Sequence, residues 1–388
     1  MVVDEVENAL HKIQKAHRIV IKVGSAVLSR PGGVEFDPVV AISLAQQIAE
    51  IMASQREVVL VSSGAILAGR QMLGLSRPNK SIGDKQALAA VGQVELMRRW
   101  TEIFRWYKIP VGQILLTKDD LVNHRRFLNA RQTIRRLLQW GILPVINEND
   151  TVLTDEIKLG DNDRLSALVT NLITADALVL LTEVDGLYTS DPHTDESAKR
   201  IEHVPSVTPE IQEQAGRPGA HGTGGMATKV EASRQSGYYG VPAMIANGRL
   251  PGVLLRILSG ENVGTVFSPA TDRLDSRKHW IAFTQEPAGR LILDQGASRA
   301  VLEGGNNLFP SGIHAAEGRF EVGDAVDLCS QEGRFLGRGI TSYGLEEVEK
   351  IKGHRSSEIE ALLGYKSSDA VVEWEDMVVG EEKWGSTK

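Results

Sequence analysis

The stretch Arg18-Ile-Val-Ile-Lys-Val-Gly24 decides the fold class. It is apolar, rich in β-branched residues and followed by Ser25, so it predicts a buried strand that ends in a turn. Asp37-Pro38 then predicts the start of a helix that runs to about Ser54, because Asp suits the N-cap and Pro suits the first helical position. A second buried strand, Glu57-Val-Val-Leu-Val61, follows this helix. Buried strands that alternate with helices indicate a parallel sheet covered on both faces.

The same alternation continues along the chain. Apolar runs predict strands over 111–116, 142–146, 177–182 and 243–246, and helical periodicity predicts helices over 85–107, 127–140, 164–173 and 226–239. The fold class is therefore α/β, a three-layer sandwich with a mostly parallel sheet. In such sheets ligands bind at the carboxyl ends of the strands. Polar clusters follow several of the predicted strands, so we expect a ligand site along that edge.

The character of the sequence changes near residue 285. Beyond it the segments are short and glycines recur at close intervals, which predicts a small, mostly β module. We therefore divide the chain into an N-terminal extension over 1–17, an α/β domain over 18–284, a β module over 285–379 and a tail over 380–388.

Composition narrows the function classes. The 388-residue chain is 42% hydrophobic and 24% charged, as in ordinary globular proteins, and its net charge of −7 argues against nucleic-acid binding by bulk charge. The single cysteine, Cys329, excludes an internal disulfide and fits the reducing cytoplasm. The N-terminus lacks the apolar core of a signal peptide, and no apolar run approaches the ~20 residues of a membrane span. We expect a cytoplasmic protein without a membrane segment.

Lys22 interrupts the first apolar strand. A buried lysine is costly unless it is paired or faces an anion. Lys22 is therefore a candidate ligand for an anionic group, although a strand lysine can also extend its amine to water.

The turn Ser62-Ser63-Gly64-Ala65 follows the second strand directly. Two hydroxyls and an unhindered glycine amide at a helix start can bind an anion through free N–H groups. Simple helix capping is the alternative interpretation.

Two clusters combine amides with acids, Asn147-Glu-Asn-Asp150 and Gly160-Asp-Asn-Asp163. We expect both in loops. Phosphoryl transfer needs Mg²⁺ ligands and acids that position cationic side chains, and amino-acid substrates need acceptors for an ammonium group. Turns stabilised by Asn and Asp side chains are the alternative.

A glycine-rich stretch, Gly222-Thr-Gly-Gly-Met-Ala-Thr-Lys229, leads into the helix predicted over 226–239. Such a stretch can hold phosphates with its backbone amides, although it lacks the spacing of a Walker A loop. A surface loop is the alternative.

These motifs, in this order, resemble the amino-acid kinase family, and within it the kinases that act on glutamate. The strings that carry the resemblance span 61–66, 127–131, 144–150, 160–163, 180–182, 185–188 and 222–229, and the match extends from Arg18 to about Val379. It implies phosphorylation of the glutamate γ-carboxylate by ATP and Mg²⁺, the first step of proline synthesis. A kinase for aspartate or N-acetylglutamate is the alternative within the same fold.

The resemblance also implies residue roles. Lys22 and Lys229 would hold the phosphates, and Asp163 would orient both lysines as the third catalytic residue. Glutamate would be bound by Ser63, Asp150 and Asn162. The nucleotide would be bound by Lys22, Thr182, Glu183, Thr223, Gly224, Gly225, Met226, Ala227, Thr228 and Lys229. Glu183 stands where the family usually has Asp. No residue is assigned as a metal ligand.

The C-terminal module resembles a PUA domain in the strings 291–297, 308–313 and 318–324. Its frequent Asp and Glu residues favour a structural or regulatory role over RNA binding, and an RNA-binding protein is the alternative from another class. The family implies further partners: proline as a feedback inhibitor, a glutamyl phosphate reductase that takes the product, and a second copy or more in a dimer or tetramer.

Overall fold

The computed structural model divides the protein into two compact units. One contains residues 1–122 and 129–271, and the other contains 272–388 together with the short segment 123–128. The structure describes residues 2–30, 35–75, 81–117, 120–121, 124–152, 162–190, 192, 195, 197–216, 225–269, 281 and 287–380.

The N-terminal unit is built on an eight-stranded sheet in the order β3-β4-β2-β1-β5-β7-β8-β6. The strands are β1 Arg18–Val23, β2 Glu57–Ser62, β3 Val111–Leu116, β4 Leu143–Glu148, β5 Ala177–Thr182, β6 His203–Val204, β7 Ala243–Asn247 and β8 Gly264–Phe267. All neighbours pair in parallel except β7 and β8, which are antiparallel. The mostly parallel sheet is therefore confirmed, and β1 lies in its interior.

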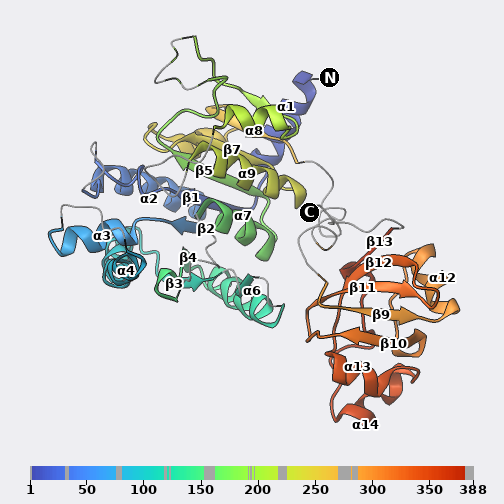
Figure 1. The fold of residues 1–388 in the computed structure, drawn as a ribbon. Coiled ribbons are helices and arrows are strands. Elements are labelled where there is room, and N and C mark those ends of the chain that lie inside the picture. The colour runs from blue at the N-terminus through green and yellow to red at the C-terminus, as the bar shows by residue number, and fades with distance from the viewer. Residues whose placement is uncertain are drawn as a thin grey trace. The chain divides into compact units, whose positions relative to one another are not determined.

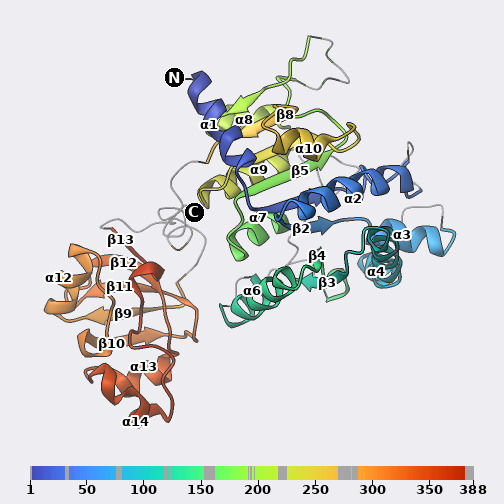
Figure 2. The same ribbon diagram turned by 180° about the vertical axis from the view of Figure 1, so that it is seen from behind.

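Helices cover both faces of this sheet. They are α1 Val2–Gln14, α2 Pro38–Ala53, α3 Ala65–Met72, α4 Ile82–Arg105, α6 His124–Gln139, α7 Asn162–Leu172, α8 Pro209–Gln214, α9 Met226–Tyr238 and α10 Val253–Leu258, with a 3₁₀ turn, η1, at Asp150–Val152. Figure 1 shows α7 and α9 in front of the sheet, and Figure 2 shows α1, α2 and α10 in front when the molecule is seen from behind. The three-layer prediction is confirmed.

Strand β1 shows how the sequence divides its residues between the two faces. Ile19, Ile21 and Val23 point to one face and are fully buried in a core shared with α2 and α10. Successive side chains of a strand alternate between the faces. Lys22 therefore points to the opposite face, where α7 and α9 lie.

The sequence predicts the second helix, α2, but not the first, α1. α2 begins as expected, because the Asp37 carboxylate accepts a hydrogen bond from the Val39 amide at 3.1 Å and Pro38 occupies the first turn. α1 falls in the stretch that we predicted as an extension, yet its residues Ala9 and Ile13 are buried in the same core as β1. The N-terminal helix is thus part of the α/β layer structure.

The C-terminal unit has a five-stranded sheet in the order β10-β9-β11-β12-β13. Its elements are β9 Gly289–Leu293, α12 Gln295–Glu303, η2 Pro310–Gly312, β10 Ile313–Gly318, β11 Ala325–Ser330, β12 Phe335–Ile340, α13 Leu345–Ile351, η3 Ser356–Glu358, α14 Ile359–Leu363, η4 Trp374–Asp376 and β13 Met377–Val379. The buried Tyr343 fixes the loop that contains Ser367 and Ser368. Its hydroxyl accepts hydrogen bonds from the amides of Ser367 at 3.1 Å and Ser368 at 2.9 Å. This small β unit confirms the predicted second module, while the predicted boundary at 284/285 lies outside the described residues.

None of the helices in the described part of the chain is long and apolar enough to cross a membrane.

Candidate active site

The strand register places the polar residues along one edge of the sheet. Val23 at the end of β1 pairs with Ser62 on β2 and with Leu181 on β5. Thr182 in turn pairs with Asn247 on β7. Since parallel strands end at the same edge, the residues after β1, β2, β4, β5 and β7 are neighbours there.

Two lysines and one aspartate form the centre of this edge. The Lys22 amine lies 2.5 Å from Asp163 Oδ1, and the Lys229 amine lies 3.1 Å from Asp163 Oδ2. The three residues come from β1, α7 and α9, so residues far apart in the sequence meet here. Their exposed fractions are 2% for Lys22, 0% for Asp163 and 4% for Lys229. All three are thus taken out of water together.

The surroundings of Asp163 fix its carboxylate between the lysines. The Thr228 hydroxyl lies within hydrogen-bond distance of two acceptors, Asp163 Oδ2 at 2.7 Å and the Gly225 carbonyl at 2.8 Å. We predicted Asn162 and Asp163 in a loop, but they form the first turn of α7. The expectation was wrong because α7 begins three residues before its first apolar side chain, Leu165, and a helix start accommodates acidic residues well.

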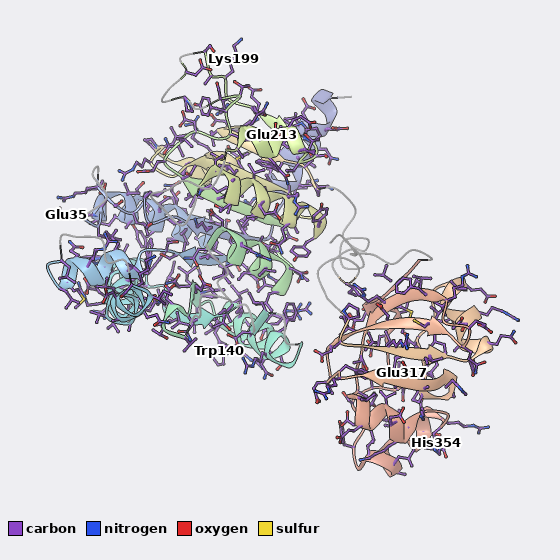
Figure 3. The ribbon with its side chains drawn as sticks, in the orientation of Figure 1. Glu35, Trp140, Lys199, Glu213, Glu317 and His354 are labelled. Atoms are coloured by element: carbon purple, nitrogen blue, oxygen red, sulfur yellow. The ribbon has the colours of Figure 1, made fainter. Side chains whose placement is uncertain are left out.

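Buried charges of this kind need a reason. The charged side chains labelled in Figure 3, among them Glu35, Lys199 and Glu213, lie at the outside of the molecule, as charged residues usually do. Burying a charge costs several kcal/mol unless partners compensate it. Lys22, Asp163 and Lys229 together carry one net positive charge, and a cationic centre at the carboxyl edge of a parallel sheet suits an anionic ligand.

A second cluster links the turn after β2 to β4 and α4 through side-chain amides. Asn162 Nδ2 donates to Ser63 Oγ and to Asn147 Oδ1, both at 2.8 Å. Asn147 Nδ2 donates to Gln93 Oε1 at 2.9 Å. Because Asn162 precedes Asp163 in α7, the amide cluster adjoins the lysine centre directly.

The turn after β2 depends on the backbone conformation of its glycine. Gly64 has φ +114°, a conformation that other residues adopt only with strain, and α3 begins at the next residue. Ser63 does not cap that helix with its side chain, since its hydroxyl accepts from Asn162 instead. Ser62 is buried and accepts a hydrogen bond from the Trp100 indole at 3.0 Å. Capping therefore does not explain the two serines.

Asp150 lies at the start of η1, half-buried beside α4. Burial raises the pKa of this carboxyl above its ordinary value. Residues Asn147 and Glu148, which we expected in the same loop, instead complete β4. The apolar run of β4 ended earlier in the sequence, but its backbone pairing with β3 extends through Glu148.

The remaining predicted residues lie on the other side of Lys22. Thr182 ends β5, where its carbonyl accepts from the Gly248 amide at 2.9 Å, and the exposed Glu183 follows it. Gly225, Met226, Ala227 and Thr228 form the start of α9 and are half-buried. Thr223 and Gly224 lie outside the described residues. The edge thus has two halves, with the amides on the side of β2 and β4 and the glycine-rich helix start on the side of β5.

Sequence reasoning placed Asn147 in a candidate cluster without giving it a role, and it did not single out Gln93 or Trp100. Gln93 and Trp100 lie in the middle of a long helix, where no turn signal or cluster marks them. The one available signal was Gly92, because a glycine inside a helix often marks a close approach of another segment.

No group of three or more His, Cys, Asp or Glu side chains that could hold a metal ion occurs among the described residues. Asp163, the carboxylate at the centre, is already occupied by two lysines.

Comparison with known proteins gives two family matches. Residues 17–247 match the model of the amino acid kinase family, and residues 289–363 match that of the PUA domain. Glutamate 5-kinase of Citrifermentans bemidjiense is 51% identical over 369 residues, which cover 95% of this chain and 98% of that protein. Glutamate 5-kinase of Syntrophotalea carbinolica is 49% identical over 368 residues, with the same coverage of both chains.

Among solved structures, UMP kinase from Bacillus anthracis aligns with a TM-score of 0.46 and 19% identity, covering 66% of this chain and 97% of that chain. An isopentenyl phosphate kinase aligns with a TM-score of 0.47 and 20% identity, covering 65% of this chain and all of that chain.

Proposed function

The chain belongs to the amino acid kinase family, and on that premise we propose that it transfers the γ-phosphoryl group of ATP to the γ-carboxylate of glutamate. The products are γ-glutamyl phosphate and ADP. Relatives about half identical over nearly the full length carry the name of this activity. The reaction is the first step of proline synthesis.

The observation that carries the proposal is the junction of Lys22 and Lys229 on Asp163. Transfer of a phosphoryl group between two anions is opposed by their repulsion, and cationic groups fixed in advance reduce that barrier. Asp163 binds each lysine through a different oxygen, so it holds both amines at a defined separation. The two lysines are therefore oriented before any substrate arrives.

The chemistry requires little more than this orientation. A γ-carboxylate oxygen attacks the γ-phosphorus, the new P–O bond forms, and the bond to the β,γ-bridging oxygen breaks with ADP as the leaving group. The carboxylate is already ionised at neutral pH, so no general base has to remove a proton. The lysines stabilise the charge that develops on the transferring oxygens.

We assign the two halves of the edge to the two substrates. Glutamate contacts Ser63, Asp150 and Asn162 on the side of β2 and β4, where Asp150 offers a carboxylate for its ammonium group. ATP binds at Thr182, Glu183 and residues 223–229, next to the start of α9. Lys22 lies between the halves, on the strand between β2 and β5, as a group that meets both substrates must. Mg²⁺ enters as part of the MgATP substrate.

A hydroxylamine-trapping assay tests the reaction and the substrate together. The protein is incubated with MgATP, hydroxylamine and one acid at a time: glutamate, aspartate or N-acetylglutamate. We expect hydroxamate from glutamate alone, in step with ADP release. Hydroxamate from another acid would retain the mechanism and replace the substrate, and no product from any acid would overturn the kinase proposal.

RNA binding through the C-terminal module is the alternative from another class. Residues 1–286 contain equal numbers of acidic and basic side chains, so the net charge of −7 arises in this module, and the polar tail beyond residue 380 is balanced. Binding to RNA depends on cationic contacts with phosphates and weakens with salt. A filter-binding titration at low and high salt should show no salt-sensitive RNA affinity.

Several family features stay predictions for this chain. They are a cytoplasmic location, assembly into a dimer or tetramer, feedback inhibition by proline and transfer of the unstable product to a glutamyl phosphate reductase. Each concerns surfaces or ligands beyond the single chain.

A further inference from the structure

We propose that Gln93 is a substrate-binding residue, and that the amide chain Gln93–Asn147–Asn162 recognises the α-amino acid head group of the acid substrate. The inference rests on the proposed function and goes further, because it names the part of the substrate that these residues contact. It starts from two buried polar groups that have no hydrogen-bond partner among the described residues, Gln93 Nε2 and Asn162 Oδ1.

Both side chains are nearly inaccessible to water. Gln93 and Asn162 are each 8% exposed. A buried polar group without a partner costs about 1–3 kcal/mol, so unpaired groups are uncommon in folded proteins and call for an explanation. Two of them in one hydrogen-bonded chain, beside the lysine centre, indicate that a ligand supplies the missing partners.

The hydrogen bonds fix what each end of the chain can do. Asn162 uses its amide nitrogen twice, toward Ser63 and Asn147, so only its carbonyl oxygen remains, and a carbonyl can only accept. Gln93 uses its carbonyl oxygen to accept from Asn147, so its NH₂ group remains, and this group can only donate. The chain therefore offers an acceptor at one end and a donor at the other.

An α-amino acid head group has the complementary pair of charges. Its ammonium group donates and suits the Asn162 carbonyl, and its α-carboxylate accepts and suits the Gln93 NH₂ group. Hydrogen bonds to charged groups are stronger than neutral ones. The arrangement selects substrates with a free ammonium and a free α-carboxylate, and leaves the γ-carboxylate for the lysine centre.

The packing of α3 on α4 places Gln93 at this point. A Cβ atom on Gly92 would lie 1.7 Å from the Ala65 carbonyl oxygen, and one on Gly69 would lie 2.1 Å from the Leu88 carbonyl oxygen. The two backbones therefore approach as closely as glycine allows, directly after the Ser62–Gly64 turn. Gln93 follows Gly92, so this contact sets it beside the end of β4 where Asn147 lies.

Gln47 provides a matched control. It is also a buried glutamine on a helix, 4% exposed, but both ends of its amide are satisfied. Gln47 Nε2 donates to the Ser43 carbonyl at 3.0 Å, and Gln47 Oε1 accepts from the Leu254 amide at 2.8 Å. Gln47→Met removes structural hydrogen bonds within α2 and between α2 and α10, whereas Gln93→Met removes the proposed substrate contact.

The test compares both variants on glutamate and on glutamate α-amide, in which the α-carboxylate is replaced by a neutral amide. We expect Gln93→Met to raise KM for glutamate at least about tenfold, the value of a hydrogen bond to a charged group. KM for MgATP should stay within about twofold of the wild type, a change smaller than the loss of one hydrogen bond would cause. Gln47→Met should lower the melting temperature and leave both KM values unchanged.

The analogue separates direct contact from loosened packing. If Gln93 binds the α-carboxylate, the wild type prefers glutamate over the α-amide, and Gln93→Met loses most of that preference. If Gln93→Met keeps the preference for glutamate, or if its KM for glutamate equals that of Gln47→Met, the inference is overturned. The proposed function is upheld in that case as long as the wild type is active on glutamate. Absence of wild-type activity on glutamate would instead remove the function on which the inference rests.

Discussion

The two units of the molecule each bury an ion pair, and the pairs differ in what they connect. In the C-terminal unit Arg338 on β12 contacts Asp327 on β11 at 2.8 Å, and the two residues are directly opposite each other in one antiparallel pair. In the N-terminal unit Lys22, Asp163 and Lys229 come from three elements that are remote in the sequence. A pair within one hairpin supports a sheet, whereas a cluster gathered from three elements at a strand edge presents charge to a ligand.

The charge balance of the two units points the same way. Residues 287–380 hold the acidic excess of the chain, and one of their cationic side chains lies in an internal ion pair. Residues 1–286, neutral in sum, concentrate two cations at one point. Burial alone therefore does not identify a functional charge. A functional charge is identified by its position at the carboxyl edge of the sheet and by the number of elements that converge on it.

The largest effect should come from the N-terminal cluster. We expect Lys229→Met to reduce kcat at least about a hundredfold, because in the proposed mechanism it removes one of two cations that stabilise the transferring phosphoryl group. The apolar side chain replaces the buried lysine stem, so the melting temperature should change little. The measurement is the steady-state rate of hydroxamate formation from glutamate, next to a thermal melt.

The same substitution at a surface lysine serves as the control for that prediction. Lys199 is an outward side chain of the same unit. Lys199→Met should therefore leave the rate unchanged. Near-normal turnover of Lys229→Met would remove the lysine assignment and with it the contrast between the two ion clusters.

The second effect concerns the C-terminal pair. Arg338→Met should destabilise the protein by about 2–3 kcal/mol, because it leaves the half-buried Asp327 carboxylate without its buried cationic partner. Glutamate phosphorylation at a temperature below the melt should keep its wild-type kcat. A loss of kcat in the folded variant would contradict the purely structural reading of this pair.

The smallest effect separates binding from stability within the N-terminal unit. Because the pKa of Asp150 is raised in the folded chain, its ionised form opposes folding at neutral pH, and this cost disappears as the pH falls through the raised pKa. Asp150→Asn should therefore stabilise the unliganded protein at neutral pH, and the gain should shrink in acid.

Glutamate binding should respond in the opposite sense. In the wild type, KM for glutamate should rise as the pH falls through the same pKa, because protonation removes the charge that attracts the ammonium group. Thermal melts and KM measurements across pH 4 to 8 check both trends. A less stable Asp150→Asn variant would show that Asp150 is a structural carboxylate.

The sequence predicts the layers of this fold better than the details of its site. β-branched runs and the Asp37-Pro38 signal locate β1 and α2, because burial and capping leave marks on neighbouring residues. Lys22 stands out for the same reason, as a charge within an apolar run. Asp163, the partner of Lys22, does not stand out in this way, because nothing near it in the sequence indicates that β1 will lie against α7.

The misses follow from the same limit. Asn147 belongs to β4 and Asn162 to α7, although both read as loop residues, because backbone pairing and helix formation continue past the last apolar side chain. Gln93 is one polar residue among many on α4 until the contact of Gly92 with Ala65 is known. Such roles depend on tertiary contacts and have no local signature.

The interior position of β1 affects how the chain can fold during synthesis. Its neighbour β5 is made more than a hundred residues later, so until residues 177–182 leave the ribosome β1 is an edge of a half-built sheet. Exposed edges invite pairing with other chains, and a lysine on such a strand discourages it. Lys22 would thus place a charge on the edge of the nascent sheet, and it reaches its buried position only once α7 and α9 are in place.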